Sequence, residues 1–278
     1  MTPKHVSRII LRAVRVKSKK RLFWWRGPPY NFGDWIGPYL FQRLCGYEPQ
    51  YALPSNRSLR TCFVTVGSIA HRFRQDSIVW GSGMIKRNQQ FWEPYETLAV
   101  RGPYTYERFR HLGYSCPEIY GDPAILLPLF FSPAVDKKYR VGVIPHYVHF
   151  EEAKALFAKE SDILIIDVRS KLETVISQIC SCERTLSSSL HGPIVSHSYK
   201  IPSAWADFSK GISGDQVKFL DYFASASIDK PPDPIMVTGR IPTSEIEAWI
   251  DSMPQPDLEG LRKPLLEVCP YKINADEA

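Results

Sequence analysis

The sequence predicts an α/β protein made of two consecutive domains, each built on a parallel β-sheet. In the first half, three short β-like runs each end at small or turn-forming residues, which is typical of parallel strands whose carboxyl ends meet a ligand. The runs cover 62–66, 77–80 and 97–100, and they lead into Gly67-Ser68, Gly81-Ser82-Gly83 and Arg101-Gly102. From residue 140 onward, strand-like and helix-like segments alternate. Two such units in succession predict two Rossmann-like domains that face each other across a cleft.

Chain length and a polar interruption place the domain boundary. With 278 residues, 44% of them hydrophobic, the chain is long enough for two cores of this kind. Residues 132–138 are polar and contain proline, and a new strand-like run starts at Arg140. We therefore predict a basic N-terminal segment at 1–27, a first Rossmann-like domain at 28–137, and a second at 138–278 that ends in a helical tail.

Capping and terminating residues mark the helices. After Asn31-Phe32-Gly33 a helical pattern runs to Gly46, with Asp34 as its expected N-cap. A second helix, over 103–113, has proline in its first turn and glycine at its end, and Gly121-Asp122-Pro123-Ala124 opens a short one. The other predicted segments are strands at 140–144, 162–168 and 184–187, and helices at 151–160, 171–181, from about 191, at 243–252 and at 257–268.

The net charge of +6 is concentrated at the start of the chain. Residues 1–33 hold nine Lys and Arg, whereas the rest of the chain has 26 basic and 29 acidic residues. A nucleic-acid reader would carry basic residues through its folded body, so we expect no nucleic-acid partner. Arg8, Arg12, Arg15 and Lys19 lie at helical spacing, so residues 1–26 either contact an anionic membrane surface or are simply solvated.

Several kinds of site and segment are not indicated by the sequence. Six cysteines are too sparse for a disulfide scaffold, and we expect mostly free thiols in a reducing compartment. The chain has neither an HExxH motif nor paired CxxC motifs, so we expect no metal and no cofactor. No apolar run reaches about 18 residues, which excludes a transmembrane helix, and the early arginines argue against a secretory signal. We therefore expect a cytoplasmic protein.

The string from Ser187 to Gly192 is the most informative in the chain. A short strand runs into three hydroxyls and Leu190, and His191-Gly192 then opens a helix. Small side chains and the N–H groups at a helix start suit an anion such as phosphate or carboxylate. An imidazole there can take or deliver a proton near neutral pH, so His191 is the first catalytic candidate. A structural or purely ligand-positioning role is the alternative.

Other candidates follow predicted strands. Arg101 comes directly after the run 97–100, where it could grip a carboxylate or phosphate with two hydrogen bonds or instead form an inter-domain salt bridge. Ser82 lies in a glycine-serine loop of weak specificity that is no P-loop. His146 and Tyr147 follow the strand 140–144 and are expected to face the same cleft.

Five strings, in this order, resemble the polysaccharide pyruvyl transferase family. They are Asn31-Phe-Gly-Asp34, Ala99-Val-Arg-Gly-Pro103, Gly121-Asp-Pro-Ala124, Ser187-Ser-Ser-Leu-His-Gly192 and Ile201-Pro-Ser-Ala-Trp205. The resemblance implies a fold like the GT-B glycosyltransferases and an enzyme that uses phosphoenolpyruvate to place a pyruvate ketal on a hexose of a surface polysaccharide. It also implies donor binding by Arg101 and catalysis by His191. Some members have an arginine where this chain has Ser189, so donor anchoring here is expected to use another cation, such as Arg87 or Lys86.

These inferences define the site that we expect. The donor-binding residues are predicted to be Arg101, Ser188, Ser189, Leu190, Gly192, Ser82 and Arg87. The acceptor-binding residues are predicted to be Asn31, Asp34, His146, Tyr147 and Trp205, although core packing is the alternative for the Trp205 ring. The acceptor is a hexose-containing oligosaccharide or a lipid-linked glycan, and the latter would place the enzyme at the inner face of a bacterial plasma membrane. The competing functions are a nucleotide-sugar glycosyltransferase and a non-catalytic carbohydrate-binding subunit of a polysaccharide assembly complex.

Overall fold

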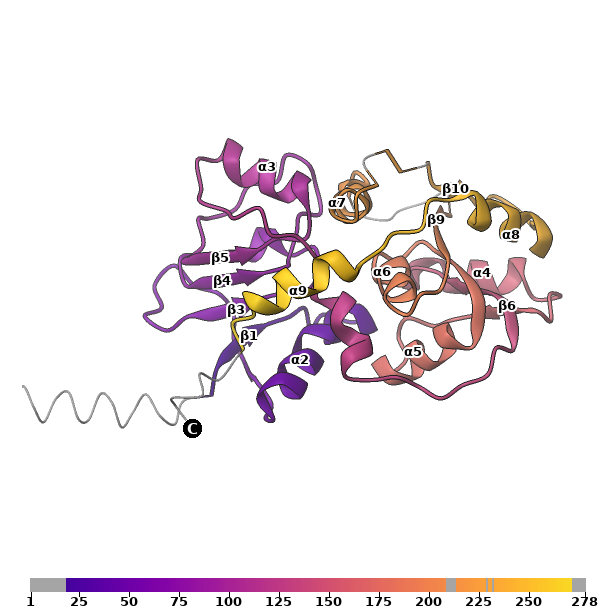
Figure 1. Ribbon diagram of the computed structural model, residues 1–278, viewed down its shortest axis with the longest axis horizontal. Helices are drawn as coiled ribbons and strands as arrows, with labels where there is room; N and C mark the ends of the chain where they lie inside the picture. The colour runs from indigo at the N-terminus through magenta and orange to yellow at the C-terminus, as the bar shows by residue number, and fades with distance from the viewer. Residues whose placement is uncertain (1–18, 209–213, 229, 232, 272–278) are drawn as a thin grey trace, which may run out of the picture.

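The protein contains two five-stranded sheets in which every paired strand runs parallel to its neighbour. The computed structural model describes residues 19–208, 214–228, 230–231 and 233–271. The first sheet has the order β2-β1-β3-β4-β5 and the second the order β10-β9-β8-β6-β7 (Figure 1). The predicted α/β class with two parallel sheets is thereby confirmed; a specific likeness to the GT-B fold is not established by this topology.

The bounds of the elements are as follows. The first sheet consists of β1 (Arg21–Phe23), β2 (Gln50–Tyr51), β3 (Cys62–Val64), β4 (Ser77–Trp80) and β5 (Glu96–Ala99), and the second of β6 (Tyr139–Ile144), β7 (Ile163–Ile165), β8 (Cys182–Ser187), β9 (Ser203–Asp207) and β10 (Ile235–Met236). The helices are α2 (Phe32–Cys45), α3 (Pro103–His111), α4 (Phe150–Leu156), α5 (Leu172–Cys180), α6 (His191–Ser198), α7 (Val217–Ser225), α8 (Thr243–Ser252) and α9 (Glu259–Glu267), with short 3₁₀ turns η1 (Ala70–Arg72), η2 (Pro123–Leu129) and η3 (Tyr147–His149).

The strand β1 lies inside the segment that we predicted as a basic extension. It pairs with both β2 and β3, so the first sheet begins before residue 28. Leu22, Phe23 and Trp24 are buried because helices or loops cover both faces of a parallel sheet. Of Phe23, Trp24 and Trp25, the consecutive aromatic residues in the segment considered for membrane contact, only Trp25 is exposed. The rest of that prediction concerns residues 1–18, which lie outside the described residues.

The N-cap of helix α2 lies three residues earlier than expected. Asn31, not Asp34, is the N-cap, and its Oδ1 accepts a hydrogen bond from the N–H of Gly33 at 3.1 Å. The N–H of Phe32 donates to the carbonyl of Val168 in the second domain at 2.8 Å. This start moves Asp34 into the first helical turn, where its side chain is released from capping.

The chain returns to the first domain after completing the second. In Figure 1, α9 lies between the two halves of the molecule and leads back toward the first sheet. The indole of Trp80 donates to the carbonyl of Leu265 at 2.9 Å. Tyr271 is fully buried, with ring centroids 4.8 Å from Phe41 and 5.4 Å from Phe63. Residues 254–271, which we call the C-terminal strap, therefore supply part of the core of the first domain.

A buried ion pair joins the two domains. Arg101 follows β5 and donates from Nε to Oδ2 of Asp221 in α7 at 3.0 Å, and neither side chain is exposed (0% each). Asp221 also accepts hydrogen bonds from the backbone N–H and the hydroxyl of Thr105, at 2.9 and 2.7 Å. These bonds offset the loss of hydration that burial of the two charges entails. The inter-domain salt bridge considered for Arg101 is thus present.

In the described part of the chain, no helix is both long and apolar enough to cross a bilayer.

Removing Asp221 is expected to destabilise the protein strongly. Asp221→Ala leaves the Arg101 charge buried without its partner, which should lower the free energy of unfolding by about 3–5 kcal/mol. Urea denaturation followed by circular dichroism measures this loss. The control is Asp251→Ala, since Asp251 is half exposed where it pairs with Arg184, and about 0–1 kcal/mol is expected there. Similar losses in the two variants would contradict the structural role of the buried pair.

Candidate active site

His191 opens helix α6 directly after the serine-rich loop that follows β8. Its residue is only 7% exposed. The hydroxyl of Ser187 lies 2.9 Å from both the carbonyl of Ile144 and that of Ser189, and it accepts the N–H of Ser189 at 3.1 Å. A Cβ on Gly192 would lie 2.0 Å from this hydroxyl, so only glycine fits there. The loop is held by its own hydroxyls, and it fixes the position of the imidazole.

The carboxylate of Asp122 faces His191. Its Oδ2 lies 3.6 Å from Nε2 of His191, while Oδ1 accepts the N–H of Ala124 at 3.0 Å and so caps η2. Both Oδ2 and Nε2 are buried, and neither has a hydrogen-bond partner among the residues that the structure describes. A distance of 3.6 Å is too long for a hydrogen bond but short enough for a favourable charge interaction with the imidazolium form.

The start of α2 forms the other wall around His191. A Cβ on Gly33 would lie 2.1 Å from Nδ1 of His191, so the motif glycine allows the helix of the first domain to approach the imidazole of the second. Burial raises the pKa of Asp34 to about 6, and the positive charge of His191 opposes this rise. The predicted residues Asn31, Asp34 and His191 thus meet, together with Asp122, at the domain interface.

A second cluster, made of the basic side chains described next, lies beside this loop. The N–H of His146 donates to the hydroxyl of Ser188 at 2.9 Å. Burial lowers the pKa of His146 to about 4, and the charge of Lys218 contributes. Lys218 of α7 is itself only 9% exposed, and its pKa is lowered to about 8, first by burial and then by Arg101, with Asp207 opposing. Arg101, Lys218 and His146 therefore share one partly desolvated region.

Lys218 forms no ion pair in this cluster. Among the residues that the structure describes, its ammonium group makes no hydrogen bond and lies 5.4 Å from the centroid of the Phe219 ring, while Asp207 acts on it only through its charge. Arg101, in contrast, is held on three sides, by Asp221, by the hydroxyl of Ser68 at 2.7 Å and by the carbonyl of Met84 at 2.7 Å. The ammonium group of Lys218 is therefore more available than the Arg101 guanidinium to donate a hydrogen bond to a ligand.

The other predicted site residues are placed as follows: Ser82 and Tyr147 lie beside the second cluster, whereas Arg87 is at the surface and Trp205 is in the core. Ser82 is buried and donates to the carbonyl of Gly67 at 2.9 Å. Arg87 is exposed, with its guanidinium 4.8 Å from the ring of Tyr104. The Trp205 ring is in the core, 4.8 Å from the ring of Phe219, which is the packing role that we considered for it. Tyr147 is half-buried against the His146 ring, with centroids 4.2 Å apart.

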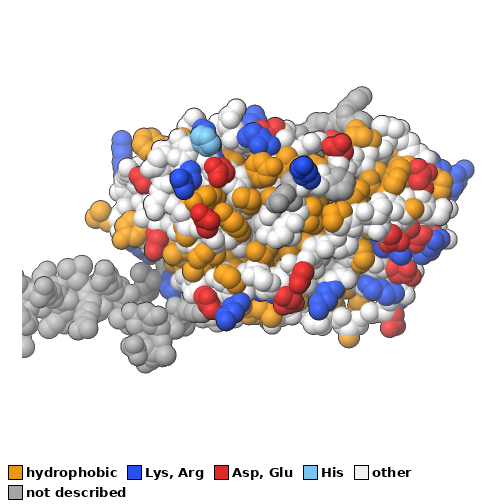
Figure 2. Space-filling view, turned by 45° about the horizontal axis from the view of Figure 1, so that its top comes forward, with side chains coloured by type: hydrophobic (Ala, Val, Ile, Leu, Met, Phe, Trp, Pro, Cys, Tyr) orange, Lys and Arg blue, Asp and Glu red, His pale blue; other side chains and the backbone are white. Residues whose placement is uncertain are grey.

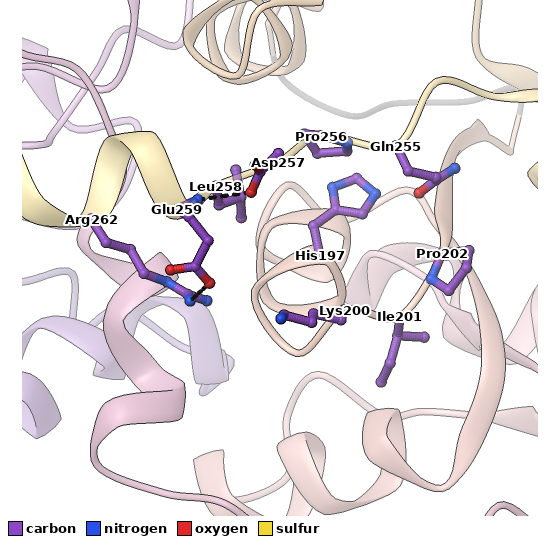
Figure 3. Close-up of a pocket in the computed structure, with 10 residues that line it drawn as sticks. All are labelled: His197, Lys200, Ile201, Pro202, Gln255, Pro256, Asp257, Leu258, Glu259 and Arg262. Carbon is purple, nitrogen blue, oxygen red and sulfur yellow. Dashed lines mark hydrogen bonds and ion pairs between the residues drawn. The ribbon is translucent and has the colours of Figure 1, made fainter.

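A separate cavity of about 280 Å³ lies between the end of α6 and the C-terminal strap (Figure 3). Figure 3 shows His197 and Gln255 on its walls, with Arg262 and Glu259 at one side. His197 is bonded at both ring nitrogens, to the hydroxyl of Tyr222 at 2.8 Å and to the carbonyl of Ser203 at 3.2 Å. Burial lowers its pKa to about 4, so this histidine is neutral and structural.

Figure 2 shows a face on which basic and acidic side chains are interspersed, with hydrophobic side chains between them. Within the described ranges, no group of three or more His, Cys, Asp and Glu residues is placed to hold a metal ion.

The family model of the polysaccharide pyruvyl transferases matches residues 53–208, which is more than half of the chain. The chain belongs to the polysaccharide pyruvyl transferase family. The protein is therefore a transferase enzyme, and its chemistry is pyruvyl transfer to a polysaccharide. The matched span contains Arg101, Asp122 and His191, whereas Asp34 and Lys218 join the site from outside it.

Individual proteins are similar to this chain. The chain is 31% identical over 211 residues to an uncharacterized protein of Acanthamoeba polyphaga mimivirus, covering 72% of each chain. It is 26% identical over 234 residues to the succinoglycan biosynthesis protein ExoV of Rhizobium meliloti (strain 1021), covering 78% of this chain and 68% of ExoV. A functionally uncharacterized protein of Klebsiella pneumoniae subsp. pneumoniae superposes with a TM-score of 0.45 at 11% identity, over 86% of this chain and all of that one.

Two residues of this candidate site had no role assigned from the sequence. Asp122 belongs to the Gly121–Ala124 string and starts a short helix, and only the structure places it, after the bridge between Val100 and Tyr120, opposite His191. Lys218 is marked by no motif, since its environment arises only when α7 packs against Arg101. The positions of Asp122 and Lys218 in the site both result from tertiary packing between distant segments.

The raised pKa of Asp34 predicts a pH-dependent stability. A carboxyl group whose pKa rises from 3.8 to about 6 on folding favours the folded state most below about pH 4, and this contribution is lost as the pH rises through 6. Asp34→Asn is therefore expected to raise the free energy of unfolding by up to about 3 kcal/mol above pH 7 and to change it little near pH 4. Urea unfolding at both pH values measures this. An equal effect at the two values would rule out the buried carboxylate as its cause.

Proposed function

We propose that the protein transfers pyruvate from phosphoenolpyruvate to two hydroxyls of one hexose in a surface polysaccharide or its lipid-linked precursor, forming a cyclic ketal and releasing phosphate. The observation that carries this proposal is Lys218, which is only 9% exposed, lies beside Arg101 and next to the loop that holds His191, and forms no ion pair with any described residue. Family membership supports the pyruvyl group, and the arrangement of charges supports an anionic donor of this kind.

The cationic cluster suits the donor. Phosphoenolpyruvate carries a carboxylate and a phosphate on one small carbon skeleton, so its binding needs several positive groups and N–H donors. Lys218 offers an ammonium group in a region of low hydration, where its attraction to an anion is strengthened. The hydroxyls of Ser188 and Ser189 and the start of α6 at Leu190 and His191 lie on the same side. In this proposal Lys218 is the cation that anchors the donor, a role that we expected of Arg87 or Lys86.

His191 is the proposed proton donor. Its imidazole lies between two carboxylates, Asp122 and Asp34, which interact favourably with its protonated form. Asp122 lies 3.6 Å from Nε2, so it acts on the ring through its charge and not through a hydrogen bond. These contacts support His191 as the group that gives a proton to the donor.

The proposed reaction balances without a metal or a cofactor. His191 gives a proton to the methylene carbon, the C=C electron pair forms that C–H bond, and the adjacent carbon becomes oxocarbenium-like. A sugar hydroxyl attacks this carbon and loses its proton, which restores the protonated state of His191. The C–O bond to phosphate then breaks, phosphate leaves with the bond electrons, and a second hydroxyl of the same sugar closes the ketal and loses its proton to phosphate. The protein contributes proximity and charge complementarity.

The acceptor is proposed to enter from the side of the first domain. Asp34 lies against His191 and is close to half protonated near pH 6, so it can accept a hydrogen bond from a sugar hydroxyl. This assigns the donor mainly to the second domain and the acceptor to the first, as in the GT-B arrangement that the resemblance implies. Contact of the basic N-terminal segment with an anionic membrane would bring the enzyme to a lipid-linked acceptor.

The proposed reaction is tested by phosphorus and proton NMR. Purified protein is mixed with phosphoenolpyruvate and methyl α- and β-hexosides, and acceptor-dependent phosphate release together with a new ketal methyl signal is the expected result. His191→Ala should lower turnover by about 10²–10⁴-fold while phosphoenolpyruvate binding persists by calorimetry. His111→Ala, on the exposed end of α3, is the matched control. Full turnover of His191→Ala would exclude His191 as the acid.

Lys218 is expected to set donor affinity. Lys218→Met keeps the length of the side chain but removes its charge, so the dissociation constant for phosphoenolpyruvate should rise about 10–100-fold at pH 7 by calorimetry. Lys86→Met, which removes an exposed cation, is expected to change it less than threefold. Because the pKa of Lys218 is about 8, the wild-type advantage should shrink as the pH rises above 8. An advantage that is constant from pH 7 to 9.5 would contradict the assignment.

A further inference from the structure

A cavity of about 450 Å³ lies on the first domain, at the carboxyl ends of β1 and β2 and along the first turns of α2. We call it the aromatic groove. Its walls include Trp24, Arg26, Tyr30, Trp35, Tyr39 and Tyr51. This volume falls within the range of about 300–1,000 Å³ that is usual for small-molecule sites. Figure 1 shows α2 beside β1, with α5 of the second domain toward the other side.

The aromatic side chains of the groove are organised into a continuous surface. The rings of Tyr30 and Trp35 are stacked, with centroids 5.5 Å apart and an interplanar angle of 21°. Trp24 meets Trp35 and Tyr51 edge to face, at 5.8 and 4.9 Å. Tyr30 is 37% exposed, although burial of an aromatic ring of this size would normally be favourable. An exposed ring on such a platform is available to stack against a ligand.

Polar groups surround this platform. Arg26 is exposed, and its guanidinium carbon lies over the rings of Tyr51, Trp24 and Trp35, at 4.5, 4.9 and 5.8 Å from their centroids, so it covers this part of the platform and leaves Tyr30 as the open ring. Gln42 and Glu48 are exposed at the edge, and within the described residues their side chains make no hydrogen bond or ion pair. An apolar platform with hydrogen-bonding groups at its edge matches a pyranose, whose C–H face is apolar and whose hydroxyls point outward. The opposite charges of Arg26 and Glu48 favour a neutral sugar.

The groove adjoins the candidate active site. Trp35 lies two residues after Gly33 in α2, and a Cβ on Gly33 would lie 2.1 Å from Nδ1 of His191. The pKa of the Tyr30 phenol is raised by burial and by the charge of Asp34, whereas a hydrogen bond with the backbone of Leu172 lowers it. Tyr39 donates from its hydroxyl to Glu173 of α5 at 2.8 Å. The groove therefore starts at the acceptor side of the cleft and extends outward along the domain interface.

We propose that the aromatic groove binds a neutral pyranose residue of the acceptor glycan, next to the hexose that receives pyruvate. This assignment rests on the proposed function, because the bound sugar is part of the acceptor only if the protein transfers pyruvate to a glycan. It implies that the enzyme recognises more than one sugar of its acceptor, and that a single-ring acceptor forgoes part of the binding energy. Tyr30 and Trp35 supply the stacking surface.

The proposal is tested by direct saccharide binding. The probes are a β-1,4-linked glucotetraose and a β-1,4-linked galactotetraose, titrated while tryptophan fluorescence and saturation-transfer NMR are recorded. At least one tetrasaccharide should bind the wild type, and Tyr30→Ala and Trp35→Leu should each weaken this binding at least tenfold. Trp25→Leu is the matched control, because Trp25 is 41% exposed and packs beside Arg72 outside the groove. Circular dichroism confirms that each variant is folded.

Turnover gives a second, separate measurement. The ratio of kcat/KM for the better tetrasaccharide to that for the matching methyl hexoside should fall at least tenfold in the groove variants and keep its wild-type value in Trp25→Leu. Equal tetrasaccharide binding by wild type and groove variants, or no binding of either probe, would overturn the groove assignment. Binding that depends on Tyr30 and Trp35 in the absence of any phosphate release would support the groove while refuting the proposed transfer reaction.

Discussion

Arg101 of the first domain and Asp221 of the second are held 3.0 Å apart with no exposure to solvent. Two charges removed from water are stabilised only while they stay together and their remaining hydrogen bonds are made, which Thr105, Ser68 and the carbonyl of Met84 provide. The pair thus fixes α7 of the second domain against the end of β5 in the first. Lys218 lies one helical turn from Asp221 on α7, so the same contact positions the lysine beside Arg101.

The surroundings of His191 depend on this docking. His191 belongs to the second domain, whereas Gly33 and Asp34 belong to the first, and the two parts approach so closely that a methyl group at Gly33 would overlap the imidazole. A close contact of this kind requires a fixed distance between the domains, and a shift of about 1 Å at a catalytic group can cost about 100-fold in rate. The buried ion pair is therefore a structural support for the acid–base site, although neither of its members needs to touch the reacting atoms.

Much of the fold and part of the site could be predicted from the sequence. The bounds of β4 and α8 were predicted as observed, because a compact apolar run and an amphipathic pattern end there at clear turn residues. The meeting of Asn31, Asp34 and His191 followed from motifs at element starts. The strand β1 was missed because three residues are too few for a periodic pattern and its neighbours are basic. The environments of Asp122 and Lys218 could not be read locally, since packing between distant segments creates them.

The C-terminal strap has a consequence for how the chain is made. Because Tyr271 fills the space between Phe41, Phe63 and Trp80, the core of the first domain stays incomplete until nearly the whole second domain has left the ribosome. The usual order, in which an N-terminal domain folds first and on its own during synthesis, is thus closed to this enzyme. The first domain therefore completes its core only after the second domain has been synthesised.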